Sequence, residues 1–190
     1  MQLIEVPGGA LSRAEGDIHL FGNPHYVMNP EQAAIVARNI ATKLVAIDPA
    51  GSAEYEKNRL AFDERLRSKI AEWKTECAAC AGKEIVSYHN DVVYFANFLG
   101  VKTGRFVEPK PGIPPTPKHL VQLEQYMKEN SVRVIALSSY HPRSDSEALA
   151  KRAGGTIALF AQSVGEVPGT EEYFALFDTN VKTLAEALKQ

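Results

Sequence analysis

Two histidines that follow predicted strands are the residues of this sequence best suited to chemistry. The apolar run EIVSY leads into His89, and the run RVIAL lies just before Ser139-Tyr140-His141. In an open parallel sheet the ligand crevice lies beyond the carboxyl ends of the strands, so both imidazoles are expected to face it. Imidazole is the commonest ligand of transition metals and prefers zinc, copper, iron or nickel over calcium and magnesium. The pattern suggests a metal site. For either histidine taken alone, the roles of metal ligand and structural residue are equally well supported.

His25 is a third candidate ligand, in the segment Asn23-Pro24-His25-Tyr26 just before a predicted helix. Histidines in turns are mostly surface residues, so spacing alone favours a surface role at this position. Glu108 and Gln162 follow the two remaining predicted strands and complete the polar set at the expected crevice.

Two cysteines and two further histidines are expected to stay outside the site. Cys77 and Cys80 end a predicted helix, and a Cys-x-x-Cys pair without a second pair is half of a structural zinc motif. Free thiols are favoured there over a disulfide or a soft-metal site. His19 and His119 have no carboxylate at ligand spacing and are expected to be solvated.

Composition and missing motifs exclude several classes of protein. The 190 residues carry a formal charge of −2 and a pI of about 6.2, which disfavours nucleic acid as a partner. The sequence has no Gly-x-Ser-x-Gly elbow, no P-loop and no His-Glu-x-x-His helix, and Gly154-Gly155 precedes a strand where a dinucleotide fingerprint would follow one. A metallohydrolase is left open, with Glu108 or Asp91 nominated as its base by position alone.

The elements that must position these residues begin with two helices. Asn29 and Pro30 suit the start of a helix over 30–47, which Asp48-Pro49 ends. A longer helix over 52–76 has one narrow apolar stripe and charged residues on its other faces, as expected of a helix that lies along a body and meets water.

From residue 84 onward, short apolar runs alternate with amphipathic helices. Strands are predicted over 84–89, 101–107, 132–138 and 156–161, with helices ending near 99 and starting near 117, 144 and 170. This alternation predicts an α/β fold in which helices cover both faces of a roughly four-stranded parallel sheet, a three-layer lobe. Five prolines in 109–117 make the loop after the second strand stiff.

An ordered series of motifs resembles a known family over essentially the whole chain. The segments are GNPHYVMNPEQA, AEYEKNRLAFDERL, KEIVSYHNDVVYFANFLG, EPKPGIPPTPKHL and EEYFALFDTNVKTLAEAL. Together they resemble the periplasmic zinc- and manganese-binding proteins of ABC uptake systems, which are ZnuA/TroA-like. The resemblance implies two lobes bridged by a long rigid helix, with a metal ion held between them by histidines and a carboxylate.

The resemblance assigns two ligands and leaves a third uncertain. His25 matches the ligand of the family's Asn-Pro-His motif. His89 matches the ligand at the head of the second lobe, where manganese-binding members often carry Glu, so histidine favours zinc. Gln162 stands where the family has a ligand Asp, and a neutral amide is a poor zinc ligand. A water, His141 or Glu166 would then substitute, or the metal would bind more weakly.

The resemblance also implies a domain organisation and a function. Most of the first lobe is expected to be missing, with 1–50 as its remnant, 51–82 as the bridging helix and 83–190 as the second lobe. The expected function is capture of Zn²⁺, or else Mn²⁺, and delivery to an ABC permease, at the periplasm or the outer face of the membrane, without enzymatic activity. Weakened binding and self-association through the surface left by the missing lobe are expected. The alternatives are a small α/β metallohydrolase using His89 and His141, and a structural or adhesive domain without metal.

Overall fold

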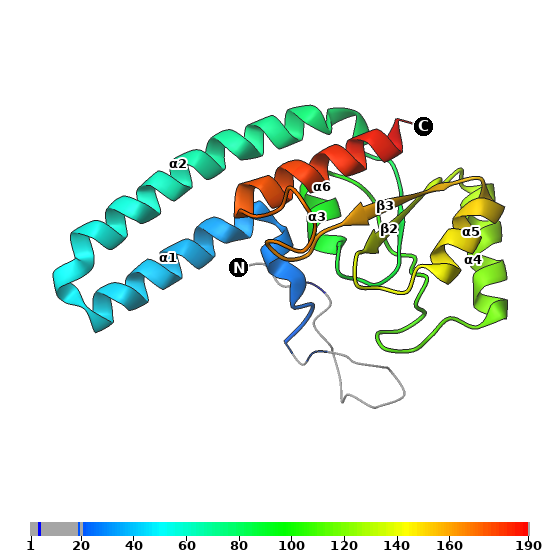
Figure 1. Cartoon of the computed structure of the whole chain (residues 1–190), viewed down its shortest axis with the longest axis horizontal. Helices are drawn as coiled ribbons and strands as arrows, with labels where there is room; N and C mark the ends of the chain where they lie inside the picture. Colours follow the sequence, from blue (N-terminus) through cyan, green and yellow to red (C-terminus); the bar gives the residue numbers. More distant parts are fainter. Residues whose placement is uncertain (1–3, 5–18, 20, 190) are drawn as a thin grey trace.

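The computed structural model describes residues 4, 19 and 21–189. Two long helices form an arm that projects from an α/β body, and the carboxyl-terminal helix lies beside the base of that arm (Figure 1). The expected remnant over 1–50 lies partly outside the described residues. Among the helices that are described, none combines the length and the apolar character needed to cross a bilayer.

The arm consists of α1 (Pro30–Ile47) and α2 (Ser52–Glu76), joined by the short helix η3 (Pro49–Gly51). The Asn29 side chain caps α1 by accepting a hydrogen bond from the backbone N–H of Glu31, and Pro30 occupies the first helical position. Both helices have the bounds that the sequence predicts. At 1.5 Å per residue α2 is about 37 Å long, and its buried residues Leu66 and Trp73 attach its second half to the body.

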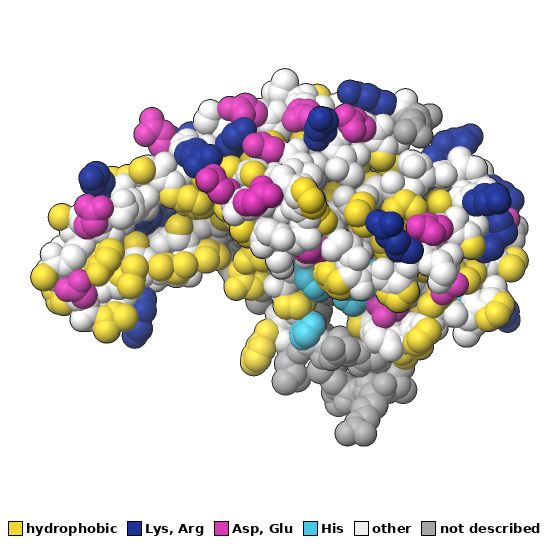
Figure 2. Space-filling view, viewed as in Figure 1, with side chains coloured by type: hydrophobic (Ala, Val, Ile, Leu, Met, Phe, Trp, Pro, Cys, Tyr) yellow, Lys and Arg dark blue, Asp and Glu magenta, His cyan; other side chains and the backbone are white. Residues whose placement is uncertain are grey.

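An apolar surface lies along the arm. Ile40, Ile47 and Leu60 are 55%, 69% and 54% exposed, respectively. Apolar side chains gather along the lower edge of the arm in Figure 2. A groove of about 290 Å³ at the base of the arm is lined by side chains of α1 together with Phe62 and Tyr173. The apolar stripe predicted for α1 is therefore largely in contact with solvent.

The sheet has three parallel strands in the order β1 (Val86–Ser87), β2 (Val134–Ser138) and β3 (Thr156–Phe160). The expectation of roughly four strands is wrong for 101–107. That segment makes two isolated bridges, Glu84 with Lys102 just before β1 and Ser87 with Phe106 at the end of β1. Between these bridges the 102–106 side has one residue more than the 84–87 side, and such an insertion interrupts a strand ladder.

Helices cover both faces of the sheet, as the alternation of elements predicts. On one face α2, α3 (Val93–Phe98) and α6 (Tyr173–Leu188) enclose a core that includes Trp73, Phe95, Phe160 and Phe177. On the other face α4 (Pro117–Glu129) and α5 (Ser144–Ala153) enclose a second core. Side chains of β2 alternate between the two, with Val134 and Ala136 in the first and Ile135 and Leu137 in the second.

Two local features differ from expectation. Cys77 and Cys80 form a disulfide and are nearly fully buried, so the expectation of free thiols is wrong. The turn η4 (Ala78–Cys80) that follows α2 brings their Cα atoms to 5.1 Å, within the range that a disulfide requires. The last helix begins at Tyr173, about three residues later than expected, after a turn in which Thr170 Oγ1 donates to the carbonyl of Val167.

Candidate metal centre

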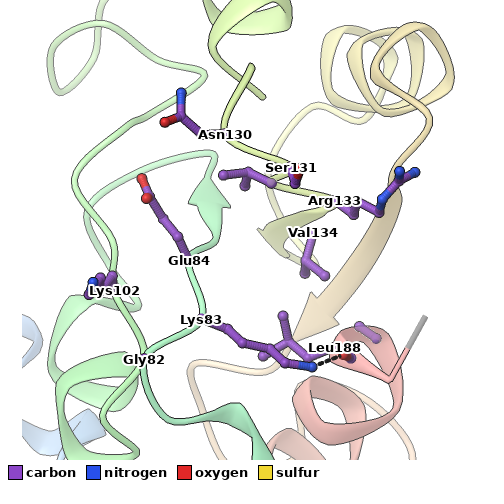
Figure 3. A pocket seen from close by; sticks show the side chains of 11 residues that line it. Gly82, Lys83, Glu84, Lys102, Asn130, Ser131, Arg133, Val134 and Leu188 are labelled. Carbon is purple, nitrogen blue, oxygen red and sulfur yellow. Dashed lines mark hydrogen bonds between the residues drawn. The ribbon is translucent and has the colours of Figure 1, made fainter. Parts of the chain in front are cut away.

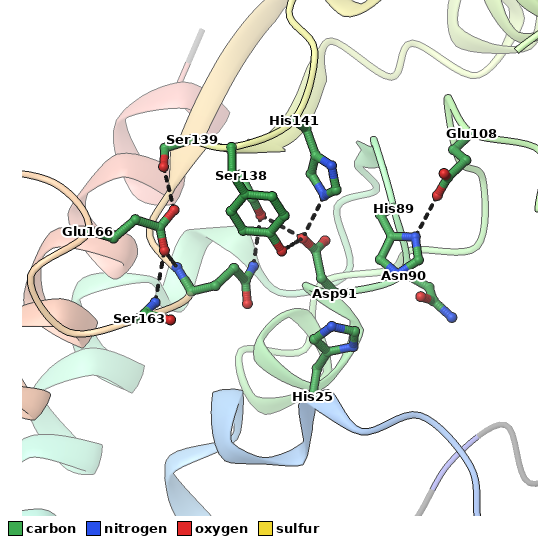
Figure 4. Close-up of polar contacts among 12 residues, drawn as sticks. His25, His89, Asn90, Asp91, Glu108, Ser138, Ser139, His141, Ser163 and Glu166 are labelled. Atoms are coloured by element: carbon green, nitrogen blue, oxygen red, sulfur yellow. Dashed lines mark hydrogen bonds and ion pairs between the residues drawn. The ribbon is translucent and has the colours of Figure 1, made fainter. Parts of the chain in front are cut away.

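Three histidines from separate parts of the chain meet at the carboxyl edge of the sheet (Figure 4). His25 comes from the short helix η2 (His25–Met28), His89 from the loop after β1 and His141 from the loop after β2. The ring centroids of His25 and His89 are 5.7 Å apart, and those of His89 and His141 are 5.8 Å apart. Two imidazoles on one tetrahedral zinc, at about 2.0–2.1 Å per Zn–N bond, have ring centres roughly 5 Å apart. Each of these two pairs of rings is therefore near the spacing of two ligands on one ion.

The Nδ1 atom of His25 is held by a side-chain amide. It lies 2.8 Å from Asn23 Oδ1, which also accepts the backbone N–H of His25 at 3.0 Å. The orientation of the Asn23 amide is fixed because its Nδ2 donates to the carbonyl of Asn90 at 2.8 Å. Since Asn23 Oδ1 only accepts, His25 carries its proton on Nδ1, which leaves the Nε2 lone pair for a ligand.

A carboxylate holds the Nδ1 atom of His89 in the same way. This atom lies 2.6 Å from Glu108 Oε2, and the other oxygen of Glu108 accepts the backbone N–H of Gly112 at 2.7 Å. Glu108 therefore ties the histidine to the proline-rich loop. An imidazole whose Nδ1–H donates to a carboxylate is the usual arrangement of a metal-binding histidine, with Nε2 directed at the ion.

His141 has the opposite orientation and contacts a buried carboxylate. Its Nε2 lies 3.2 Å from Asp91 Oδ2, and its ring packs between Tyr88 and Tyr140 at centroid distances of 4.5 and 4.4 Å. Asp91 Oδ2 also accepts from Ser138 Oγ at 2.6 Å and from Tyr140 Oη at 3.3 Å. The sequence places Asp91 two residues after His89, but proximity to a strand end does not reveal its burial or its partners.

The electrostatics of the cluster suit a cation. Burial lowers the pKa of His25; the Asp91 carboxylate opposes this shift and His89 adds to it. Burial alone would raise the pKa of Asp91, but hydrogen bonds from His141 and Ser138 bring it below its usual value. Burial, together with the nearby Asp91 charge, raises the pKa of Tyr140 to about 12. At neutral pH the site thus contains an ionised carboxylate and a neutral His25 imidazole, the states that bind metal.

The loop after β3 contributes supporting contacts. Gln162 Nε2 donates to Ser138 Oγ at 3.0 Å, and Gln162 Oε1 is buried without a hydrogen-bond partner in the described structure. The Glu166 carboxylate accepts the backbone N–H groups of Gln162 and Ser163 at 2.7 and 2.9 Å and also binds Ser139 Oγ. Both oxygens of Glu166 thus hold the loop after β3 and attach it to the loop after β2, as Figure 4 shows.

The remaining histidines and a second polar cavity lie elsewhere. His19 is exposed, and His119 Nε2 contacts the carbonyl of Phe106 at 2.9 Å. A cavity of about 460 Å³ opens at the amino end of the sheet, where Lys83 Nζ binds the carbonyl of Leu188 (Figure 3). Over residues 4, 19 and 21–189, no group of three or more His, Cys, Asp or Glu side chains is arranged so that it could hold a metal ion.

Known proteins resemble this chain over most of its length. It is 28% identical over 172 residues to the iron ABC transporter substrate-binding lipoprotein MtsA of Streptococcus pyogenes serotype M1, covering 87% of this chain and 55% of MtsA. It is 26% identical over 173 residues to the manganese ABC transporter substrate-binding lipoprotein PsaA of Streptococcus pneumoniae, covering 88% of this chain and 56% of PsaA. The chain thus spans about half the length of these relatives.

Structural and family comparisons agree with these relatives. The crystal structure of a zinc-bound AdcAII variant of Streptococcus pneumoniae superimposes with a TM-score of 0.77 at 25% identity, covering 99% of this chain and 67% of that one. The family profile described as "Zinc-uptake complex component A periplasmic" matches residues 3–187. Because this match covers nearly the whole sequence, the chain belongs to the ZnuA family.

Proposed function

We propose that this chain binds Zn²⁺ as part of the substrate-binding component of an ABC uptake system, which passes the ion to a permease in the membrane. Family membership and relatives named for iron, manganese and zinc support metal as the cargo. Nitrogen ligands favour zinc over manganese, so Mn²⁺ is the second candidate. The relatives support a location in the periplasm or on the outer face of the membrane.

His25 and His89 are the proposed ligands. One observation carries this assignment. In both rings a side-chain oxygen holds Nδ1, and the two ring centroids are 5.7 Å apart. Both Nε2 lone pairs are therefore available to one ion after a small adjustment. Of the two further candidates from the sequence, His141 has its Nε2 on Asp91. Gln162 donates through Nε2 to Ser138, and its Oε1, a poorer zinc ligand than a carboxylate, has no hydrogen-bond partner among the described residues.

Isothermal titration with zinc tests the assignment. We expect one zinc ion per chain, and His89→Ala to weaken binding by more than about 100-fold, because even a lost outer-shell partner costs about 10–100-fold. His119→Ala is the matched control, since this histidine contacts a backbone carbonyl away from the cluster. Equal zinc affinity for the unmodified chain and His89→Ala would refute the proposed function.

No enzymatic activity is proposed. The metallohydrolase alternative needs Glu108 as a free base, but both of its oxygens already accept hydrogen bonds, from His89 and Gly112. No relative described above is named as a hydrolase. Metal-dependent turnover of generic ester substrates, abolished by His89→Ala, would favour the alternative.

For the domain organisation, we propose that 1–50 belong with a first lobe, 51–82 form the bridge and 83–190 form the second lobe.

For the partners, we propose that two copies of this chain associate through the apolar surface of the arm, where Ile40, Ile47 and Leu60 are exposed. Light scattering tests this association, and Ile47→Asp is expected to shift the chain toward monomer. If the unmodified chain is monomeric at high concentration, self-association is refuted.

A further inference from the structure

The buried carboxylate of Asp91 has no assigned role in metal binding. Asp91 is 1% exposed and lies among the rings of His25, His89 and His141 (Figure 4). Resting on the function proposed above, we propose that Asp91 is the carboxylate ligand of the metal site and binds the ion through Oδ1. The loop after β3 has Gln162 at the position of the family's ligand Asp.

The hydrogen bonds of Asp91 divide unequally between its two oxygens. Oδ2 accepts from Ser138 Oγ, Tyr140 Oη and His141 Nε2. Oδ1 accepts no hydrogen bond within the described part of the chain. It is also not one of the fully buried atoms without a partner. The three donors on Oδ2 fix the carboxylate in one orientation, so Oδ1 is the atom left to bind an ion.

Charge also favours a cation next to Asp91. A buried carboxylate is costly unless it is paired or coordinates a metal. Across residues 21–189, no Lys or Arg forms an ion pair with Asp91, and the ring of His141 is the one basic side chain in contact with its carboxylate. The Asp91 carboxylate and the imidazoles of His25 and His89 give the mixed oxygen and nitrogen ligand set that zinc accepts in proteins.

Gln162 then has a supporting role. Its Nε2 donates to Ser138 Oγ, and Ser138 Oγ donates to Asp91 Oδ2. This chain of hydrogen bonds connects the loop after β3 to the loop after β1. The family resemblance places the ligand carboxylate in the loop after β3. In this chain Asp91 supplies it from the loop after β1, two residues from His89.

The direct test is a crystal structure of the zinc-loaded chain with anomalous scattering at the zinc edge. We expect Asp91 Oδ1 at about 2.0–2.2 Å from the zinc. A zinc ion more than about 3.5 Å from both Asp91 oxygens, or one bound by Gln162 Oε1, would overturn the proposal. This measurement uses the unmodified chain and therefore does not depend on whether a variant folds.

Titration of variants separates this inference from the proposed function. We expect Asp91→Asn to weaken zinc binding at least about 10-fold and Ser138→Ala, which leaves the carboxylate in place, to weaken it less. If His89→Ala abolishes binding while a folded Asp91→Asn binds as tightly as the unmodified chain, the inference fails and the proposed function stands. If His89→Ala binds normally, the proposed function itself fails. Circular dichroism establishes folding of each variant.

Discussion

Replacing Glu108 with Gln tests how the protein fixes His89. Glu108 accepts two hydrogen bonds, one from His89 Nδ1 at 2.6 Å and one from the backbone N–H of Gly112 at 2.7 Å. A carboxylate offers two acceptor oxygens, whereas an amide offers one oxygen and an NH₂ group. In Glu108→Gln the NH₂ group must therefore face one of two N–H donors.

Either outcome weakens metal binding. If the amide oxygen stays with Gly112, its NH₂ group faces His89, and the imidazole avoids the clash by moving its proton to Nε2, the atom needed for the metal. If the oxygen stays with His89, the proline-rich loop loses its hydrogen bond and the imidazole is held less firmly. Loss of such an outer-shell partner costs about 10–100-fold in metal affinity, or about 1.4–2.7 kcal/mol.

Competition titration against a zinc chelator measures the affinity, and long-range ¹⁵N–¹H NMR of the metal-free chain reports which His89 nitrogen carries the proton. Glu84→Gln is the matched control because it removes the same charge at the amino end of the sheet, where Glu84 accepts from Tyr126. The control is expected to bind zinc as the unmodified chain does. A Glu108→Gln chain with unchanged affinity and the proton still on Nδ1 would refute this reasoning.

Three further predictions concern stability. Asn180→Ala should lower the free energy of unfolding by about 2–4 kcal/mol in urea titrations, because the buried N–H and C=O of Ala161 both lose their partner; a loss below about 1 kcal/mol would contradict this. Tyr173→Phe should raise it by about 1 kcal/mol, because the Tyr173 hydroxyl is buried with no hydrogen-bond partner found in the described structure. Burial raises the pKa of Tyr173, so above about pH 10 the unfolded chain loses this proton first and the free energy of unfolding falls. Urea titrations from pH 8 to 11 should show a shallower decline for the variant, and equal slopes would count against it. Reduction of the disulfide between Cys77 and Cys80 should cost about 2 kcal/mol, as expected for a very short closed loop; a double Cys→Ser variant should be insensitive to reductant, and a reductant effect of equal size in that variant would refute the assignment.

Helix bounds and the layer order were predictable because they depend on local patterns. Asn29 and Pro30 mark the start of α1, and the continuous helical spacing of apolar residues up to Trp73 defines α2. The segment 101–107 has the apolar character of a strand, but whether it pairs depends on its partner's register. One extra residue between its two bridges interrupts the ladder, and no local pattern reports that.

The sequence by itself determined the two long helices, the alternation of strands and helices after them, the family resemblance and the choice of His25 and His89 as candidate ligands. Periodicity, capping residues and ordered motifs are local features of the chain. Tertiary structure decided the rest. It brought Asp91 into contact with His141, placed Asn23 and Glu108 on the Nδ1 atoms of His25 and His89, and closed the disulfide after α2. These features depend on groups that meet only after folding: Asn23 lies 67 residues from its partner Asn90, and Asp91 lies 50 residues from His141. Burial and hydrogen bonding at such distances set which nitrogen is protonated and which oxygen is available, and no spacing along the chain encodes them.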